Sequence, residues 1–458
     1  MRTVVALGLS LPLLACSPAR VDYGALTRAA EERQRAVGLA AETDNVGVAA
    51  LLSRPLSADS AARVAVLNNQ AARAAVEELG IAEAELVGAR RLPNPTLEAA
   101  LRFEGEERPA IELGAMLDLS DLLLYAARSG AASSEVEAAK LSAVGAVLDV
   151  SFEARRAFLR HQADVALLSL RREVLSTFDA AAELAQRLRA AGNITELDAA
   201  NQRSLFEEAR FQLQRAELAA AASRADLSAL LGVWGAGARF RIEPELPAPP
   251  QRQLDVARLE STAVERSLEL AIIRQRFAGA AARGDVARAR AFLPELKAGV
   301  VAEREERWSL GPAVELELPL FYQGQAERGV AAAQQRQQRY LYADQAVRLR
   351  ASARSAATRL RAAADATRYY REVLLPLRER VVEESQLQYN GMLIGLFQLL
   401  QAKRDEVEAR AAYVEQLRDF WLARTDVEQL LSGRFVSVGA AAIPVASPSG
   451  GSSGVDDH

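Results

Sequence analysis

The side chains that could do chemistry in this 458-residue chain are few and far apart. The sequence has two histidines, His161 and His458, and one cysteine, Cys16, which together lack the spacing of a metal site. It contains no glycine-rich phosphate loop and no Ser-His-Asp arrangement. Its many carboxylates fall in helical patterns, where such groups usually form solvated faces. We therefore expect no enzymatic activity, no catalytic residues, no cofactor and no metal, and we expect His161 on a helix surface.

Cys16 ends an N-terminal segment that has the features of an export signal. Arg2 precedes an apolar run from Val4 to Leu14, which is too short to span a bilayer as a mature helix. The run ends in Leu13-Leu14-Ala15-Cys16, which resembles the bacterial lipoprotein signal, whose cysteine is thioether-linked to a diacylglycerol. We expect a signal peptide over residues 1–15 and lipidation of Cys16. A simple secretory signal with a chance cysteine is the alternative.

The stretch from Ser120 to Ala191 contains no proline and predicts one very long helix. Its apolar residues recur at steps of mostly three or four, with Arg and Glu between them, which is the pattern of a single buried stripe. They are Leu141, Val144, Leu148, Phe152, Leu159, Leu170, Val174, Phe178 and Leu188. At about 1.5 Å per residue the helix would be roughly 100 Å long. It must therefore belong to an elongated assembly in which neighbours cover the stripe.

The chain also repeats its own pattern at a shift of 199 residues. Arg172-Glu173-Val174-Leu175 recurs as Arg371-Glu372-Val373-Leu374, Gly192 as Gly391, Leu197 as Leu396, and Glu106-Glu107-Arg108 as Glu305-Glu306-Arg307. A constant shift over this length indicates an internal duplication. The shorter helices predicted around the two long ones are Asp59–Arg91, Ile194–Gly232, Leu254–Ala291 and Leu393–Leu431, and the second long helix is Gly324–Asn390.

Two features within the second copy shape its helices. Leu400, Val407, Val414 and Trp421 lie seven residues apart, as a coiled-coil seam requires. Pro376 predicts a kink in the second long helix. Between the copies, Arg239–Ile242 predicts a short strand.

Each copy also contains a predicted β-hairpin between its helices. In the first copy, apolar and polar residues alternate over Thr96–Glu104 and again over 111–119, separated by a charged turn. The second copy repeats the pattern over 296–302 and 310–320. Alternation of this kind gives a hairpin with one apolar and one polar face.

Strands of about ten residues are long enough to cross a bilayer when tilted. The alternative is a four-stranded sheet packed on the helices in water, but the chain has no other strand-rich region to complete a soluble β domain. Four strands cannot close a barrel, and open edges are not tolerated in lipid. Several chains would have to contribute strands, eight in a dimer or twelve in a trimer.

The order of these motifs resembles the TolC-like outer-membrane efflux protein family over nearly the whole mature chain. The motifs are Arg91-Leu92-Pro93-Asn94-Pro95-Thr96-Leu97 before a hairpin, the long helix, the turn Ala191 to Asp198, Leu230-Leu231-Gly232, and Tyr389-Asn390-Gly391 in the second copy. The resemblance implies a mainly α fold with a β-barrel part. Long antiparallel coiled-coil helices would form a periplasmic α-barrel, and four strands from each chain of a homotrimer would form a twelve-stranded barrel in outer-membrane lipid.

The resemblance also implies a function and partners. The chain would be the exit duct of a tripartite efflux or type I secretion system, working with a periplasmic adaptor protein and an inner-membrane pump. A net charge of −4 gives no basic face for nucleic acid. The alternative function is that of a lipid-anchored coiled-coil protein that spaces or bridges the cell envelope without a channel.

Site residues follow from the same resemblance. It implies that the two helix-to-helix turns are the periplasmic tips that dock the adaptor, with Gly192, Asn193 and Thr195 in one turn and Asn390, Gly391 and Gly395 in the other. In the family, acidic residues after the tip glycine often ring the constriction of the pore. The first copy keeps one at Asp198. The second copy has Phe397 and Leu400 at the matching positions, which suggests a more apolar constriction edged by Gln398 and Gln401, although Leu400 also fits the coiled-coil seam.

The predicted domain boundaries combine these elements. Residues 1–15 are the signal peptide, 16–57 the lipidated segment and an equatorial region, and 58–232 the first outer-membrane efflux repeat. Residues 233–253 are a linker in the equatorial region, and 254–432 are the second repeat. Residues 433–458 form a tail that we expect to be disordered at its end.

Overall fold

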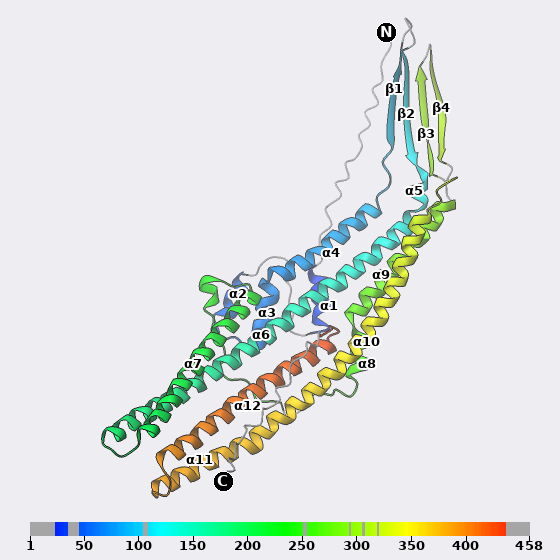
Figure 1. The fold of residues 1–458 in the computed structure, drawn as a ribbon. Coiled ribbons are helices and arrows are strands. Elements are labelled where there is room, and N and C mark those ends of the chain that lie inside the picture. The colour runs from blue at the N-terminus through cyan, green and yellow to red at the C-terminus, as the bar shows by residue number, and fades with distance from the viewer. Residues whose placement is uncertain are drawn as a thin grey trace, which may run out of the picture.

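The computed structural model of the chain describes residues 23–34, 45–103, 109–250, 254–292, 295–304, 307–317 and 320–436. The signal peptide, the lipidation of Cys16, the charged turn 105–108 and the tail beyond residue 436 lie outside the described residues. The molecule is elongated, with strands at one end and two separate helical tips at the other (Figure 1).

The two halves share the order of helices, hairpin, long helix and returning helix, although α5 occurs only in the first half and the long helix is interrupted only in the second. Two short helices, α1 (Tyr23–Glu31) and α2 (Asn45–Leu52), come first. The first half then contains α3 (Ala58–Asn68), α4 (Gln70–Ala89), β1 (Thr96–Arg102), β2 (Ala110–Asp118), α5 (Leu119–Leu123), α6 (Tyr125–Ala190) and α7 (Glu196–Leu231). A short helix, η1 (Gly235–Ala238), follows. The second half contains α8 (Leu259–Arg266), α9 (Leu268–Phe292), β3 (Glu295–Arg304), β4 (Trp308–Glu317), α10 (Gln325–Tyr369), the π-helical turn η2 (Tyr370–Leu374), α11 (Leu375–Asn390) and α12 (Leu396–Leu431).

The long first helix is confirmed: α6 runs without interruption for 66 residues. Its apolar stripe is covered by different neighbours along its length. Phe152 packs in a cluster with residues of α1, α3, α4 and α9, whereas Phe158 packs with residues of α2, α3 and α7. Nearer the tip, Val174 and Phe178 pack with Val407 of α12. The core is therefore a series of small clusters along one rod.

Two helices predicted as continuous are broken by capping residues. Asn69 separates α3 from α4, because its backbone is extended and its side-chain oxygen accepts a hydrogen bond from the N–H of Ala72 at 3.1 Å. Ser267 separates α8 from α9, and its hydroxyl accepts from the N–H of Leu270 at 3.2 Å. Asn and Ser compete with the helical backbone for hydrogen bonds, so they start new helices where packing favours a bend.

The shift between the halves is also not constant, which corrects the predicted correspondence at the tips. The helices that leave the tips, α7 and α12, begin at residues 196 and 396, a shift of 200. The extra residue lies in the π-helical turn η2, which the first half lacks. Gly192 therefore corresponds to Met392, and Leu197 corresponds to Phe397, instead of the Gly391 and Leu396 that the sequence match gives.

The four strands form one antiparallel sheet in the order β1-β2-β3-β4. The two predicted hairpins join through β2 and β3, with Ala115 opposite Val300. In this register most apolar residues of the four strands, with the exception of Met116 and Val301, share one face, on which Leu97 is 82% exposed and Leu310 is 77% exposed. The chain's own helices do not cover this face. Among the described helices, none is long and apolar enough to cross a membrane.

The segment between the halves contributes less than predicted. The expected strand at Arg239–Ile242 is a single parallel bridge between Ile242 and Leu56, with the N–H of Leu56 bonded to the carbonyl of Arg241 at 2.8 Å. The loop lies against α6, where the Gln162 amide donates to the carbonyls of Glu243 and Glu245. These hydrogen bonds hold the loop between the halves against the middle of α6.

Candidate functional site

The first helical tip joins α6 to α7 through a glycine-dependent turn. Gly192 has a φ of +74°, and the N–H of Asn193 bonds to the carbonyl of Leu188 at 2.9 Å, closing the end of α6. Thr195 then caps α7. Its hydroxyl accepts from the N–H of Asp198 at 3.1 Å, and the Asp198 carboxylate accepts from the N–H of Thr195 at 3.2 Å.

The second tip uses the same geometry with different residues. Met392 has a φ of 59° and occupies the position that Gly192 has in the first tip. Gly391 has a φ of −79°, an angle that any residue can adopt. The sequence match pairs Gly391 with Gly192, but the one-residue shift places the left-handed position at Met392. Gly395 precedes α12, and its N–H donates to the Gln398 side chain at 3.2 Å.

These backbone angles give a prediction for the tips. A non-glycine residue in the left-handed region costs about 1–2 kcal/mol, so Gly192→Ala should destabilise the protein by about that amount. Met392→Gly should stabilise it by up to about 1 kcal/mol, since glycine also loses more chain entropy on folding. Denaturant unfolding of the detergent-solubilised protein measures both. Gly391→Ala is the matched control and should be neutral, so an equal loss there would contradict the assignment.

The predicted constriction residues lie in the first turns of α7 and α12. Asp198 and Gln398 are structurally equivalent capping residues, so the counterpart of Asp198 is Gln398 and not Phe397. Phe397 and Leu400 are half-buried, and the Gln401 amide donates to Asp405 at 2.9 Å. Among the described residues, no hydrogen bond joins one tip to the other. The tips are thus brought to the same end of the molecule but remain separate (Figure 1).

Charged side chains between α6 and α12 were not predicted from the sequence. Arg171 pairs with Glu408 at 2.6 Å, and Arg410 lies 3.5 Å from Glu173. Lys403 also lies 3.8 Å from Glu173. These pairs flank the apolar contact of Val174 and Phe178 with Val407. Val407 is buried, as predicted for a residue of the coiled-coil seam. They connect a helix of the first half to a helix of the second half above the tips.

A second unpredicted cluster ties the C-terminal segment to both halves. Arg434 donates to Asp149 of α6 at 2.9 Å and lies 2.8 Å from Glu269 of α9. Burial alone would lower the pKa of Arg434, but the hydrogen bond to Asp149 and the charge of Glu269 outweigh burial and raise this pKa. The guanidinium therefore stays charged while it is enclosed.

His161 is buried, which corrects the expectation of a surface histidine. It is 2% exposed in α6, and its Nδ1 lies 3.1 Å from the hydroxyl of Ser223 in α7. Burial, and then the charge of Arg224, lower its pKa. No pattern of neighbouring residues indicates this burial, because the side chains that cover His161 come from α7. No group of His, Cys, Asp and Glu among the described residues could hold a metal ion.

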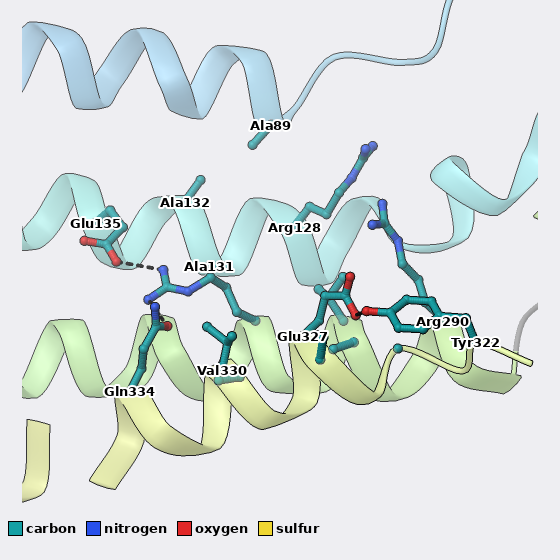
Figure 2. A pocket seen from close by; sticks show the side chains of 16 residues that line it. Ala89, Arg128, Ala131, Ala132, Glu135, Arg290, Tyr322, Glu327, Val330 and Gln334 are labelled. Atoms are coloured by element: carbon teal, nitrogen blue, oxygen red, sulfur yellow. Dashed lines mark hydrogen bonds and ion pairs between the residues drawn. The ribbon is translucent and has the colours of Figure 1, made fainter. Parts of the chain in front are cut away.

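A groove of about 830 Å³ lies between α4, α6, α9 and α10, at the ends of these helices that are nearest the sheet. Small apolar side chains such as Ala131 and Val330 line it (Figure 2). At its sides Arg283 donates to Glu135 at 2.8 Å, and Tyr322 donates to Glu327 at 2.5 Å. The first pair joins α9 to α6 and so helps to fasten the helices just below the strands.

Comparisons with known proteins agree with this geometry. No family model matches the chain. The cobalt-zinc-cadmium resistance protein CzcC of Cupriavidus metallidurans is 24% identical over 394 residues, which cover 82% of this chain and 90% of CzcC. A membrane protein from Pseudomonas aeruginosa has a TM-score of 0.70 at 20% identity, covering 85% of this chain and 91% of that structure. The outer membrane channel CmeC of Campylobacter jejuni has a TM-score of 0.66 at 14% identity, covering 86% and 87%.

The long helices, the separate tips and the open-edged sheet define the class: the chain has the fold of an outer-membrane channel with a helical extension. Within that class its fold is TolC-like, and the resemblance inferred from the order of its motifs is confirmed.

Proposed function

We propose that this protein is the outer-membrane exit duct of a tripartite efflux or type I secretion system. The observation that carries the proposal is the four-stranded sheet. Its apolar face is exposed, and β1 and β4 are its two edge strands. Open edges and an exposed apolar face are costly in water, and closing them into a barrel in lipid removes both costs.

We further propose that three copies close the pore. Twelve strands would form one barrel, with β4 of each copy pairing with β1 of the next. The outer helices support this arrangement, because their free sides carry exposed apolar residues that a neighbouring copy would cover. These include Ile81 and Val87 on α4, Phe211 and Leu218 on α7, Tyr340 and Val347 on α10, and Leu377 and Leu387 on α11.

Cys16 carries the lipid, a periplasmic adaptor docks on the two tips, and an inner-membrane pump supplies the energy. Asp198 and Gln398, with Phe397, Leu400 and Gln401, lie at the narrow periplasmic end. The two repeats, 58–232 and 254–432, form the wall. The chain itself does no chemistry and supplies a water-filled path.

Metal cations are the cargo class that we propose. The name of the relative CzcC connects that protein with cobalt, zinc and cadmium resistance. The face of the sheet that would line the barrel is acidic: its register places Glu98, Glu112, Glu303 and Glu315 there against Arg102 and Lys297. A pore lined by carboxylates favours cations.

The Cys16→Ser variant tests the channel against the lipid-anchored spacer. The variant loses the lipid. We expect it to remain in the outer membrane, to require detergent for extraction, to elute as a trimer by light scattering, and to conduct in planar bilayers with a reversal potential that favours cations. A spacer held only by its lipid would become soluble and monomeric, and that result would refute the barrel. An anion-selective current would refute the proposed cargo alone.

A further inference from the structure

His161 is enclosed where three parts of the molecule meet. Its ring, carried by α6, faces α7, where the Ser223 hydroxyl lies 3.1 Å from its Nδ1. The next residue, Gln162, is also buried and donates to the carbonyls of Glu243 and Glu245. These two residues belong to the loop 238–246 between the halves. The ring therefore lies at the point where α6, α7 and this loop are fastened together.

The hydrogen bonds around Ser223 determine which ring nitrogen of His161 carries the hydrogen. The Ser223 hydroxyl donates its one hydrogen to the carbonyl of Ala220 at 3.3 Å. Its oxygen is left to accept from His161, so Nδ1 carries the ring hydrogen and Nε2 carries a lone pair. Nε2 is buried and has no hydrogen-bonding partner among the described residues. A proton added to Nε2 would create a charged N–H that meets no acceptor, which is costly in a buried position.

A fixed positive charge also opposes that proton. Arg224, the residue after Ser223, donates to the carbonyls of Ala238 and Phe240 at 2.8 and 2.9 Å. Its guanidinium lies 4.6 Å from the centre of the Phe240 ring, so it holds the loop against α7. Burial, and then the charge of Arg224, lower the pKa of His161, and the smaller opposing effect of Asp164 does not reverse this.

The other charged side chains on the nearby segments are at least partly exposed, so water solvates them. They are Arg160 on α6, Asp226 on α7, Asp59 and Arg63 on α3, Arg418 and Asp419 on α12, and Arg239, Arg241, Glu243 and Glu245 in the loop. Solvated charges of both signs give little stabilisation to a buried imidazolium.

The direction of the pH dependence follows from these contacts. An accessible histidine has a pKa of about 6.5, so at higher pH the ring is neutral whether it is enclosed or open to water. At lower pH the open state binds a proton that the enclosed state does not bind. The contacts around His161 are therefore at full strength at neutral pH, and they weaken as the pH falls below about 6.5.

We propose that His161 is an acid-sensitive fastener between α6, α7 and the loop 238–246. A charged ring is stable only in water, so on protonation it leaves its place against Ser223. The loop is then released as well, because Gln162 and Arg224, which hold it, flank the same ring. This device goes beyond the proposed function. It depends on contacts within one copy, so it holds or fails independently of the channel.

Hydrogen exchange at two pH values tests the fastener. After correction for the intrinsic exchange rate, we expect the opening equilibrium of amides 220–224 in α7 to rise up to about tenfold from about pH 7.5 to about pH 5.5. Amides 183–188, near the first tip, are the internal control and should show no such rise. An opening equilibrium at 220–224 that does not change with pH would overturn the proposal.

Two variants assign the effect to one ring. His161→Asn retains a donor close to the position of Nδ1 but cannot be protonated, so its opening equilibrium at 220–224 should not depend on pH. His458→Gln removes the only other histidine of the chain and should behave as the parent protein does. A pH response that persists in His161→Asn, or that disappears in His458→Gln, would contradict the assignment to His161.

The ring can also be observed without any change in the helices. Solid-state NMR of the protein labelled with ¹⁵N-histidine, in lipid, gives signals for two histidines, and His458→Gln identifies the signal of His161. We expect the His161 ring to stay neutral at about pH 5.5, with its hydrogen on Nδ1, under conditions where an accessible histidine is charged. A His161 signal that titrates near pH ~6.5, or a hydrogen on Nε2, would overturn the fastener even if His161→Asn did not fold.

Discussion

Leu310→Arg is expected to prevent the protein from assembling in the membrane. Leu310 is on the apolar face of the edge strand β4 and is 77% exposed. Leu310 is the third residue of the ten-residue strand β4, so an arginine there costs less than the roughly 2–4 kcal/mol of the bilayer midplane, but a trimer would contain three of them. The yield of detergent-extracted trimer from the outer membrane fraction, measured by unheated gel electrophoresis, should fall to near zero.

The neighbouring residue provides the matched control for this change. Ser309 points to the opposite face of β4 and is paired across the sheet with Glu303. Ser309→Arg adds the same charge beside a carboxylate in the proposed water-filled interior. The yield of Ser309→Arg trimer should therefore be close to that of the parent protein. The channel should, however, prefer cations less strongly than the parent channel does. Equal losses in the two variants would show that the apolar face does not contact lipid.

Arg434→Ala is expected to have the largest effect on stability among single changes in the helical part. The Arg434 side chain is 17% exposed and lies between Asp149 and Glu269. Removing it leaves two carboxylates close together without their cation, and breaking a buried pair in this way costs about 3 kcal/mol or more. The free energy of unfolding, from denaturant titration, should fall by that amount.

Two further variants separate this effect from the general loss of a charge. Arg187→Ala removes an exposed pair with Glu183 within α6 and should change stability by less than about 0.5 kcal/mol. Arg434→Lys keeps the positive charge, but a lysine ammonium cannot reproduce the guanidinium's contacts with both Asp149 and Glu269. Its loss of unfolding free energy should therefore lie between those of Arg434→Ala and Arg187→Ala. If Arg434→Ala were as mild as Arg187→Ala, the cluster would contribute nothing beyond a surface ion pair.

Much of the local structure could be predicted because it depends on residues close together in the chain. The three- and four-residue spacing over Ser120–Ala191 predicted α6, and the alternation after Thr96 predicted the first hairpin. The breaks at Asn69 and Ser267 were missed, although both residue types are good helix caps. A cap changes the path of the chain only where the neighbouring helices favour the bend, and the sequence does not show these neighbours.

The tips show how a one-residue change escapes a sequence comparison. The match of Gly192 with Gly391 was exact in residue type, but the π turn η2 moves the left-handed position to Met392. A π turn has no residue pattern of its own, since it differs from an α-helix by one backbone bond. The correspondence of Asp198 with Gln398 is therefore visible only in the three-dimensional structure.

By itself, the sequence determined the element types, their order, the apolar and polar faces of the hairpins and the resemblance to a channel family. These depend on periodicity and on motifs that each lie within a short stretch. Only the tertiary structure decided that β2 joins β3 into one sheet, that His161 is covered by α7, and that Arg434 lies between Asp149 and Glu269. Such contacts join residues far apart in the chain, and their partners are selected by packing and charge in three dimensions.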